Sequence, residues 1–269
     1  MARVVVTGGA GKLGRACVDE LIRHGWDVVV FDRVPPPTES GAVFVPIDLT
    51  DYGQVLDAML GWRNIDIYQV HWPDLHTPPE ETAGALEELV AEGKIRHVGV
   101  SNYAVDEMHA LGRFGRVETL QPPYHLFRRE IEETILPYAA AHDIGVLVYG
   151  PLAHGLLSGR MSESTTFDAD DWRGKSPDFT AETFRRNLAV VERLKGFARQ
   201  KDISLPQLAV AWTLANPAVH VAIVGARRPS QLDETAQAAD IELSTSDLQA
   251  INETLAGAVP VWGPHPEGM

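Results

Sequence analysis

Short runs of β-branched and other apolar residues alternate with longer stretches of helical periodicity along almost the whole chain. This alternation is typical of a parallel α/β fold. Eight strands are predicted, at residues 3–7, 27–32, 43–47, 65–70, 95–100, 117–121, 145–149 and 219–224. Eight is also the number of strands in a closed (β/α)8 barrel.

The helices are predicted from the residues that begin and end them. Residues 12–24 run from a glycine-rich turn to Gly25, and another helix opens at Pro78-Pro79-Glu80-Glu81 and ends at Gly93. Further helices are predicted at 52–60, 130–142, 180–200, 206–215, 229–238 and 245–256. Loops are predicted at 34–37, where three prolines follow one another, and at 162–179, with a loosely ordered tail at 258–269.

Composition and charge narrow the class of protein. The chain has 269 residues and a formal net charge of −14, which disfavours nucleic acid and anionic membrane surfaces as partners. One cysteine, Cys17, fits a reducing compartment. Arg3 is followed at once by a predicted strand, and no stretch approaches the roughly 20 apolar residues of a membrane helix. We therefore expect a cytoplasmic protein. Its histidines show no metal-ligand spacing, so no metal site is predicted.

A glycine-rich turn follows the first strand. The sequence Thr7-Gly8-Gly9-Ala10-Gly11-Lys12-Leu13-Gly14 lets the chain turn sharply at Gly8 and Gly11 and lets the helix pack closely at Gly14. The helix amino terminus would offer free N–H groups to a pyrophosphate. Asp32 ends the next strand, 18 residues after Gly14, where an acid can accept hydrogen bonds from ribose hydroxyls and repel a 2′-phosphate.

Residues 3–60 resemble the amino-terminal part of the extended short-chain dehydrogenases and NAD-dependent epimerases. The match continues through Phe31-Asp32-Arg33 to Asp48-Leu49-Thr50-Asp51, where that family places an acid near the adenine. The resemblance implies that Gly8, Gly11, Gly14, Asp32, Arg33 and Asp48 bind a cofactor. The family's catalytic Tyr-x-x-x-Lys pair is missing, because no tyrosine has a lysine four residues later.

Residues 64–257 resemble an aldo-keto reductase instead. The motif from Ile65 to Trp72 resembles the strand that ends in that family's active-site histidine, which implies a catalytic role for His71. The resemblance also implies that Ser101, Asn102 and Gln121 hold the nicotinamide carboxamide and that Tyr149 stacks on its ring. The remaining cofactor contacts that it implies are Gly150, Pro151 and Leu152 directly after Tyr149, Ser158 and Arg160 in the loop over the pyrophosphate, and Gly225, Ala226, Arg227, Gln231 and Glu234 around the adenosine phosphate. All of them follow predicted strands, where parallel α/β folds gather ligands.

The catalytic set of the reductase family is incomplete. Its chemistry uses an Asp, a Tyr, a Lys and a His, and His71 alone has its counterpart here, since the other three belong to strands that the first 60 residues replace. No lysine lies between Lys12 and Lys94. We expect turnover to be impaired.

Two portions are therefore predicted: a Rossmann-like dinucleotide-binding portion, residues 1–62, and a partial reductase barrel, residues 63–269. A dinucleotide fold orders its strands 3-2-1-4, whereas a barrel places strand three beside strand four. We predict an open or irregular parallel sheet made of a Rossmann-like βαβ portion and five βα units of a TIM-barrel reductase. A closed chimeric barrel is the alternative.

The leading functional hypothesis is an NAD(P)-dependent oxidoreductase acting on a small-molecule carbonyl compound. A non-catalytic NAD(P)-binding protein and a chimera without a function are the alternatives. Asp32 favours NAD and Arg227 favours NADP, so the cofactor is predicted as NADP or NAD. The substrate and the oligomeric state are left open by the sequence.

Overall fold

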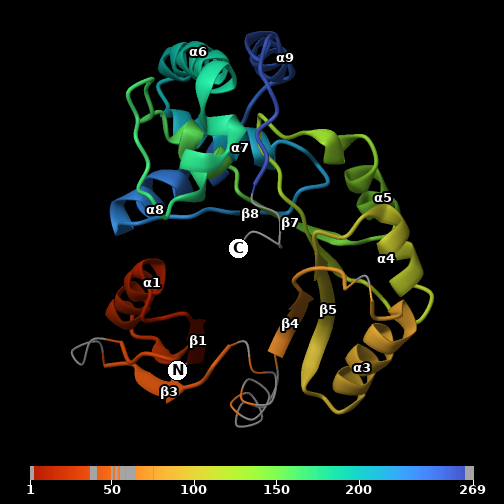
Figure 1. The fold of residues 1–269 in the computed structure, drawn as a ribbon. Coiled ribbons are helices and arrows are strands. Elements are labelled where there is room, and N and C mark those ends of the chain that lie inside the picture. The colour runs from red at the N-terminus through yellow and green to blue at the C-terminus, as the bar shows by residue number, and fades with distance from the viewer. Residues whose placement is uncertain are drawn as a thin grey trace. The chain divides into compact units, whose positions relative to one another are not determined.

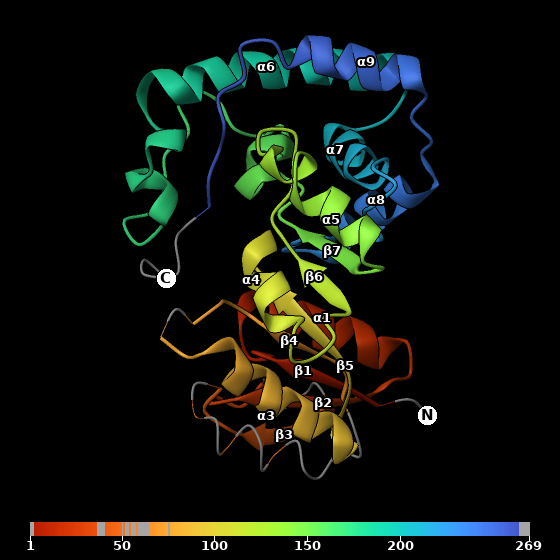
Figure 2. The same cartoon turned by 90° about the vertical axis from the view of Figure 1, so that its right-hand side faces the viewer.

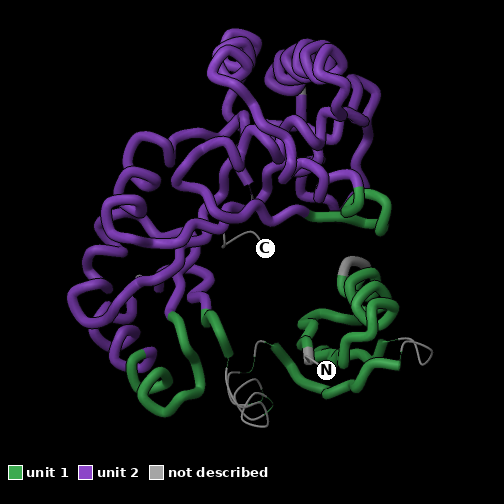
Figure 3. The backbone as a smooth tube through the Cα atoms, turned by 180° about the vertical axis from the view of Figure 1, so that it is seen from behind, with its two compact units in different colours: residues 1–68, 87–97, 225–233 green, residues 69–86, 98–224, 234–269 purple. Residues whose placement is uncertain are grey.

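The computed structural model describes residues 3–36, 41–49, 51, 54, 58, 65–74 and 76–263. The chain divides into two compact units (Figure 3). Unit 1 comprises residues 1–68, 87–97 and 225–233, and unit 2 comprises residues 69–86, 98–224 and 234–269. The predicted boundary at residue 62 lies outside the described residues.

The described strands are parallel and form two sheets, one of three strands in the order β1-β2-β3 and one of five in the order β4-β5-β6-β7-β8 (Figure 1). The strands are β1 (Arg3–Thr7), β2 (Asp27–Asp32), β3 (Val43–Pro46), β4 (Ile65–Val70), β5 (Ile95–Ser101), β6 (Thr119–Gln121), β7 (Gly145–Tyr149) and β8 (Val221–Ile223). The predicted α/β class, with a βαβ portion followed by five βα units, is confirmed. Within the described segments, no strand ladder joins the two sheets.

Helices follow most of the strands, as is usual for parallel sheets, although no described helix separates β2 from β3. They are α1 (Lys12–Arg23), α3 (Pro79–Ala91), α4 (Val105–Leu111), α5 (Ile135–Ala141), α6 (Ala181–Gln200), α7 (Leu205–Leu214), α8 (Pro229–Ala236) and α9 (Thr245–Thr254). Short 3-10 turns are η1 (Glu130–Glu132), η2 (Ala153–Ser158), η3 (Trp172–Lys175), η4 (Pro177–Phe179) and η5 (Gln237–Asp240). Apart from Gln54 and Ala58, the predicted helix 52–60 lies outside the described residues.

Three sequence predictions need correction. Helix α4 was not predicted, because it is only seven residues long and its amino terminus at Ala104 has no polar cap residue; the Glu107 carboxylate accepts the Ala104 N–H instead, at 2.7 Å. The single helix predicted at 130–142 is two elements, η1 and α5. The predicted loop at 162–179 contains two 3-10 turns, η3 and η4.

The central strand of the three-stranded sheet, β2, is buried on both faces. The burial pattern of β2 is continuous from Val28 to Phe31, although successive side chains of a strand point to opposite faces. Val28 and Val30 pack with Val18 of α1, and Val29 and Phe31 pack with Ile47 on the other face. This pattern is typical of a strand in a parallel α/β sheet.

Unit 2 contains the larger core, and its helices α6 and α9 lie side by side (Figure 2). Two guanidinium nitrogens of Arg193 on α6, Nε and Nη2, donate to backbone carbonyls at the end of α9, at 2.7–3.2 Å from Thr254 O and Ala256 O. Ser204 caps α7 in a capping box with Gln207, and Ser244 caps α9 with Asp247. These caps fix where each helix begins.

The segment after α9 is ordered as far as the described residues extend, which corrects the prediction of a loose tail. Val261 is fully buried, and its N–H donates to Phe127 O at 3.0 Å. Asn187, fully buried on α6, holds Val259 by both backbone groups: its Oδ1 accepts the Val259 N–H at 2.8 Å and its Nδ2 donates to Val259 O at 3.0 Å. We call these two hydrogen bonds the Asn187 clip. The proline- and glycine-rich composition of residues 258–269 did not predict it.

Replacing Asn187 with Ala should lower the free energy of unfolding by about 2–3 kcal/mol, because it leaves two partly buried backbone groups of Val259 without partners. The exposed Gln249→Ala on α9 is the control and should change it by less than about 0.5 kcal/mol. Urea unfolding followed by circular dichroism measures both. Equal effects of the two variants would show that the clip contributes nothing.

Candidate functional site

The glycine-rich turn of unit 1 has the geometry that a dinucleotide needs. Gly8 adopts a left-handed conformation with φ +67°, and its N–H donates to Phe31 O at 2.9 Å, which ties the turn to β2. A Cβ on Gly14 would overlap the Gly8 carbonyl oxygen and lie 2.6 Å from Gly9 Cα. Gly11 caps α1 without a side-chain hydrogen bond, so the first N–H groups of the helix remain available to an anion.

Asp32 closes the turn from the end of β2. Its Oδ2 accepts the Ala10 N–H at 2.9 Å and its Oδ1 accepts the Val34 N–H at 3.2 Å. These backbone hydrogen bonds, Ala10 first, lower the pKa of the carboxyl, so Asp32 is ionised at neutral pH. Each carboxylate oxygen keeps further acceptor capacity, which ribose hydroxyls could use. Next to it, the exposed Arg33 guanidinium lies 3.6 Å from an Asp48 carboxylate oxygen.

In unit 2, a chain of hydrogen bonds connects residues at the carboxyl ends of four neighbouring strands. The Tyr149 hydroxyl on β7 donates to Asn102 Oδ1 at 2.8 Å. Asn102 Nδ2 donates to His71 O after β4, at 3.0 Å, and to Ser101 Oγ on β5, at 3.1 Å. Ser101 Oγ in turn donates to Gln121 O on β6, at 2.8 Å. The structure thus brings together five of the residues singled out from the sequence.

Asn102 is at the centre of this network and adopts a left-handed conformation, φ +62°. Asparagine tolerates that region better than most non-glycine residues. Three of the four hydrogen-bonding positions of its amide have protein partners. By contrast, the Gln121 amide nitrogen, half-buried beside it, has no hydrogen-bond partner among the described residues. An incoming carboxamide would therefore meet Gln121 as the available donor.

Tyr149 is held in a partly buried position, and burial raises the pKa of its hydroxyl. The phenol therefore stays neutral at physiological pH and acts as a hydrogen-bond donor to Asn102. One edge of the ring is fixed by this bond. A fixed flat ring is suited to stacking on an aromatic ligand.

His71 presents an exposed ring next to Trp72, with 6.0 Å between the ring centroids. Its backbone carbonyl belongs to the Asn102 network, whereas its imidazole does not. The Trp72 indole nitrogen is buried, with no hydrogen-bond partner among the described residues. The histidine side chain is therefore accessible on a backbone that the network fixes.

The loop after β7 uses its polar groups internally. Gly150 has φ +71°, Pro151 is buried and Leu152 is half-buried. Ser158 Oγ donates to Gly155 O at 2.6 Å and accepts the Arg160 N–H at 3.3 Å. The Arg160 side chain is exposed, so of these residues it is the one free to meet a phosphate.

The segment after β8 is divided between the units. Within unit 1, Gly225 and Arg227 are exposed and Ala226 is half-buried, while the Arg227 N–H donates to Gln231 Oε1 at 2.8 Å. Within unit 2, the backbone oxygen of Glu234 accepts Gln207 Nε2 at 3.1 Å. The Arg227 guanidinium is thus solvent-facing, and Gln231 shapes the turn that carries it.

The sequence analysis missed a second polar layer beneath the network. Gln69 Nε2 donates to Val100 O at 2.8 Å, and Thr119 Oγ1 donates to Gln69 Oε1 at 3.3 Å. A Cβ on Gly99 would overlap Thr119 Oγ1 and lie 2.6 Å from Gln69 Oε1. The signal was present, because Gln69 stands two residues before His71 in an otherwise largely apolar strand and so lies on the same face.

Comparison with protein families shows to which family the chain belongs. The model of the aldo/keto reductase family matches residues 54–256, about three quarters of the chain. The chain belongs to the aldo-keto reductase family. The model of the NAD dependent epimerase/dehydratase family matches residues 4–81 of the same chain, so both predicted resemblances are confirmed. Nicotinamide dinucleotides are the cofactors of both families.

The curated relatives match part of this chain. It is 42% identical to aldo-keto reductase YhdN of Bacillus subtilis over 196 residues, which cover 72% of this chain and 59% of the relative. It is 32% identical to the NADH-specific methylglyoxal reductase of Escherichia coli over 197 residues, 72% of this chain and 60% of the relative. The alignments thus span about three fifths of the length of these curated relatives.

A solved structure of glycerol dehydrogenase from Gluconobacter oxydans is similar over more of the chain. Its TM-score is 0.77 at 29% sequence identity, with 98% of this chain and 94% of that chain covered. Among the described residues, no helix is long and apolar enough to cross a membrane.

Gly14→Ala should lower the free energy of unfolding by about 1–3 kcal/mol, because the added methyl group overlaps the backbone of Gly8 and Gly9. Gly84→Ala is the matched control, since a Cβ on this exposed residue of α3 meets nothing within 4 Å. The control should raise stability by up to about 1 kcal/mol through helix propensity. Urea titration of both variants gives the comparison, and a neutral Gly14→Ala would refute the close packing.

Tyr149→Phe should cost about 1–2 kcal/mol of stability, because it leaves Asn102 Oδ1 without its donor inside the network. Tyr138→Phe removes a hydroxyl that has no hydrogen-bond partner among the described residues and should cost less than about 0.5 kcal/mol. Thermal unfolding at several urea concentrations measures both variants. If the two tyrosines behave alike, the network is not coupled to folding.

Proposed function

We propose that this chain binds NADP(H) or NAD(H) at the strand-end network of unit 2 and transfers hydride between the nicotinamide and a small carbonyl compound or alcohol. The observation that carries the proposal is the continuous chain of hydrogen bonds from Tyr149 through Asn102 to Ser101 and the backbones of His71 and Gln121. Four consecutive strands contribute to it, and family membership assigns a nicotinamide cofactor to such enzymes.

The residues present fit the nicotinamide end of the cofactor. The Gln121 amide nitrogen is available to a carboxamide oxygen, and the Tyr149 ring is fixed for stacking. The exposed guanidinium of Arg160, in the same unit, would serve a phosphate group. When bound, the cofactor supplies the hydride, and the protein must hold the carbonyl and move a proton.

The proposed reaction also needs a residue that supplies the proton. His71 alone has a counterpart in the family's catalytic tetrad, and its imidazole is exposed beside the network. We propose that His71 orients the substrate carbonyl and also donates the proton. Histidine is suited to this task near neutral pH, but it lacks the supporting Asp, Tyr and Lys, so turnover should be slow.

Residues in the two parts of the sequence favour different cofactors. Asp32 is ionised and would repel a 2′-phosphate, which favours NAD at the glycine-rich turn. Arg227 is an exposed cation, which favours NADP. The methylglyoxal reductase relative is named NADH-specific. We infer that the strand-end network binds either nucleotide.

A second candidate is a non-catalytic NAD(P)-binding protein. The specific observation in its favour is the absence of a Tyr-x-x-x-Lys pair anywhere in the chain, together with the lack of any lysine between Lys12 and Lys94. On that proposal the binding contacts persist without an efficient proton donor.

His71→Ala should reduce aldehyde-dependent NADPH or NADH oxidation by about a hundredfold, the scale of a lost general acid, while the cofactor Kd stays within about twofold. His109→Ala on α4, also an exposed histidine, is the control and should leave the rate unchanged. The assay follows absorbance at saturating methylglyoxal. Cofactor binding without consumption in the unchanged protein would favour the second candidate, and equal rates for both variants would remove His71 from catalysis.

A further inference from the structure

The strand-end network of unit 2 lies directly beside a second layer of polar groups on the same face of the sheet. The register between β5 and β6 pairs Gly99 with Thr119. Two residues further along, Ser101 and Gln121 of the network are paired in the same way, so both pairs point to one face. The Gln69 side chain of β4 reaches the first of these layers, where its Oε1 accepts the Thr119 hydroxyl at 3.3 Å.

The Gln69 amide is bonded in one orientation. Its Nε2 donates to Val100 O of β5 at 2.8 Å, and its Oε1 accepts from Thr119 of β6. A backbone carbonyl can only accept, so turning the amide round would set two acceptor oxygens against each other. Gly99 makes room for this side chain, because a Cβ there would lie 2.6 Å from Gln69 Oε1. One side chain of β4 thereby joins three neighbouring strands.

Strand β4 depends on such bonds more than its neighbour does. None of its six residues is buried, whereas five of the seven residues of β5 are buried. Within the described segments, β4 is also the outermost strand of the five-stranded sheet. Burial of apolar surface is the main force that stabilises a strand in a core. A strand with little burial is therefore fixed to a greater extent by its hydrogen bonds.

Gln69 and Asn102 form a reciprocal pair of contacts between the ends of β4 and β5. Asn102 Nδ2 donates from the end of β5 to His71 O, at 3.0 Å. Gln69 Nε2 donates in the opposite direction, from β4 to Val100 O. On each strand the donor residue and the acceptor residue are two positions apart, so the two bonds enclose the same short segment. Together they limit sliding of β4 along β5 next to His71.

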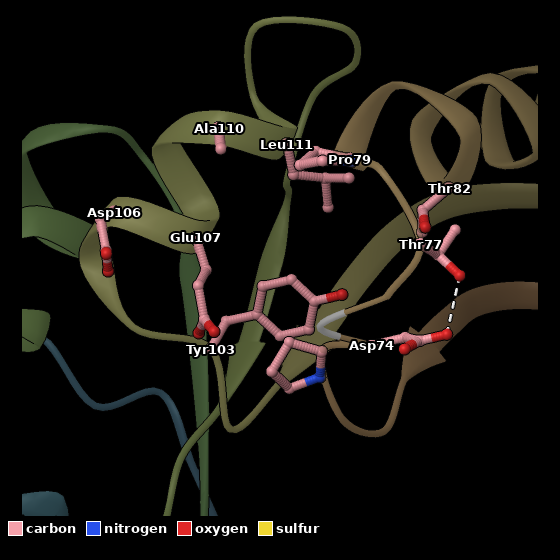
Figure 4. Close-up of a pocket in the computed structure, with 10 residues that line it drawn as sticks. Asp74, Thr77, Pro79, Thr82, Tyr103, Asp106, Glu107, Ala110 and Leu111 are labelled. Carbon is pink, nitrogen blue, oxygen red and sulfur yellow. Dashed lines mark hydrogen bonds between the residues drawn. The ribbon is translucent and has the colours of Figure 1, made fainter.

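The loop that follows β4 is held in a different way. Asp74 accepts the His76 N–H at 2.9 Å and the Thr77 hydroxyl at 2.7 Å, and the second of these bonds is drawn in Figure 4. Both bonds stay within the loop, so they do not tie it to the sheet. Side-chain links to the neighbouring strands come instead from Gln69 and Asn102.

We propose that Gln69 is a positioning residue of the candidate site, which fixes the end of β4 so that the His71 imidazole meets the substrate carbonyl in a set place. This inference rests on the proposed reductase function. Gln69 acts through the backbone, because its amide is engaged by Val100 O and Thr119 and it stands two residues before His71. A displacement of about 1 Å at a reacting group can cost about a hundredfold in rate.

The first part of the test measures the network without any substrate. Gln69→Met keeps the length of the side chain and removes both hydrogen bonds. We expect the side-chain NH2 resonances of Asn102, recorded by ¹H–¹⁵N NMR on the full chain, to shift toward the position of an exposed amide, because the His71 carbonyl moves away. Gln249→Met, at an exposed glutamine of α9, is the matched control and should leave those resonances unchanged.

The second part measures reduction of methylglyoxal with NADPH or NADH. Gln69→Met should lower kcat about tenfold and leave the cofactor Kd within about twofold, because the His71 side chain is displaced and the Gln121 amide is not. Thr119→Val keeps the shape of the side chain without its hydroxyl and should lower kcat about threefold. Thr119→Ser keeps the hydroxyl for Gln69 and should recover most of that loss.

Unchanged Asn102 resonances in Gln69→Met would overturn the proposal. Shifted resonances with an unchanged kcat would also overturn it, because Gln69 would then be a structural residue only. If Gln69→Met does not fold, the two Thr119 variants decide, and equal kcat values for them would contradict the proposal. A folded chain without turnover would refute the proposed function and the catalytic purpose of Gln69 with it, whereas the Asn102 resonances would still show whether Gln69 holds the end of β4.

Discussion

The amide of Asn102 is the interaction on which the candidate site depends. One side chain holds a hydroxyl from β7, a hydroxyl from β5 and the backbone that follows β4. Its left-handed backbone conformation places the amide where all three partners can be reached at once. The positions of Tyr149 and His71 follow from this amide. A cofactor ring would therefore bind to a surface that is fixed before it arrives, which reduces the entropic cost of binding.

A different constraint governs unit 1. There the close approach of Gly14 to Gly8, and the hydrogen bond from Ala10 to Asp32, set the turn between β1 and α1. Both constraints are local to their own unit and use short-range packing or hydrogen bonds. This locality explains how one chain can carry two nicotinamide-type motifs from two families, matched at residues 4–81 and 54–256. On our proposal neither motif brings a complete catalytic set, because each family's remaining residues would lie in the part that the other motif occupies.

Most of the fold could be predicted from the sequence because its strands are short, β-branched and separated by glycine and proline. The turn at Gly8–Gly14 and the strand-end residues Ser101, Asn102 and Tyr149 were found because each belongs to a spaced motif. Helix α4 was missed because Glu107, three residues into the helix, supplies the cap that Ala104 lacks. The Asn187 clip and the Gln69–Thr119 layer were missed because they join residues far apart in sequence, 72 and 50 positions respectively. Hydrogen bonds of that kind follow from tertiary packing and have no periodic signal.

The most direct test of the central claim is a calorimetric titration with NADPH and NADH, carried out on the unchanged chain, Gln121→Leu and Gly11→Val. The strand-end network predicts one saturable site, weakened about tenfold by Gln121→Leu and retained in Gly11→Val. Binding that Gly11→Val abolishes and Gln121→Leu leaves intact would move the cofactor to the glycine-rich turn. A folded protein that binds neither nucleotide would contradict the account altogether.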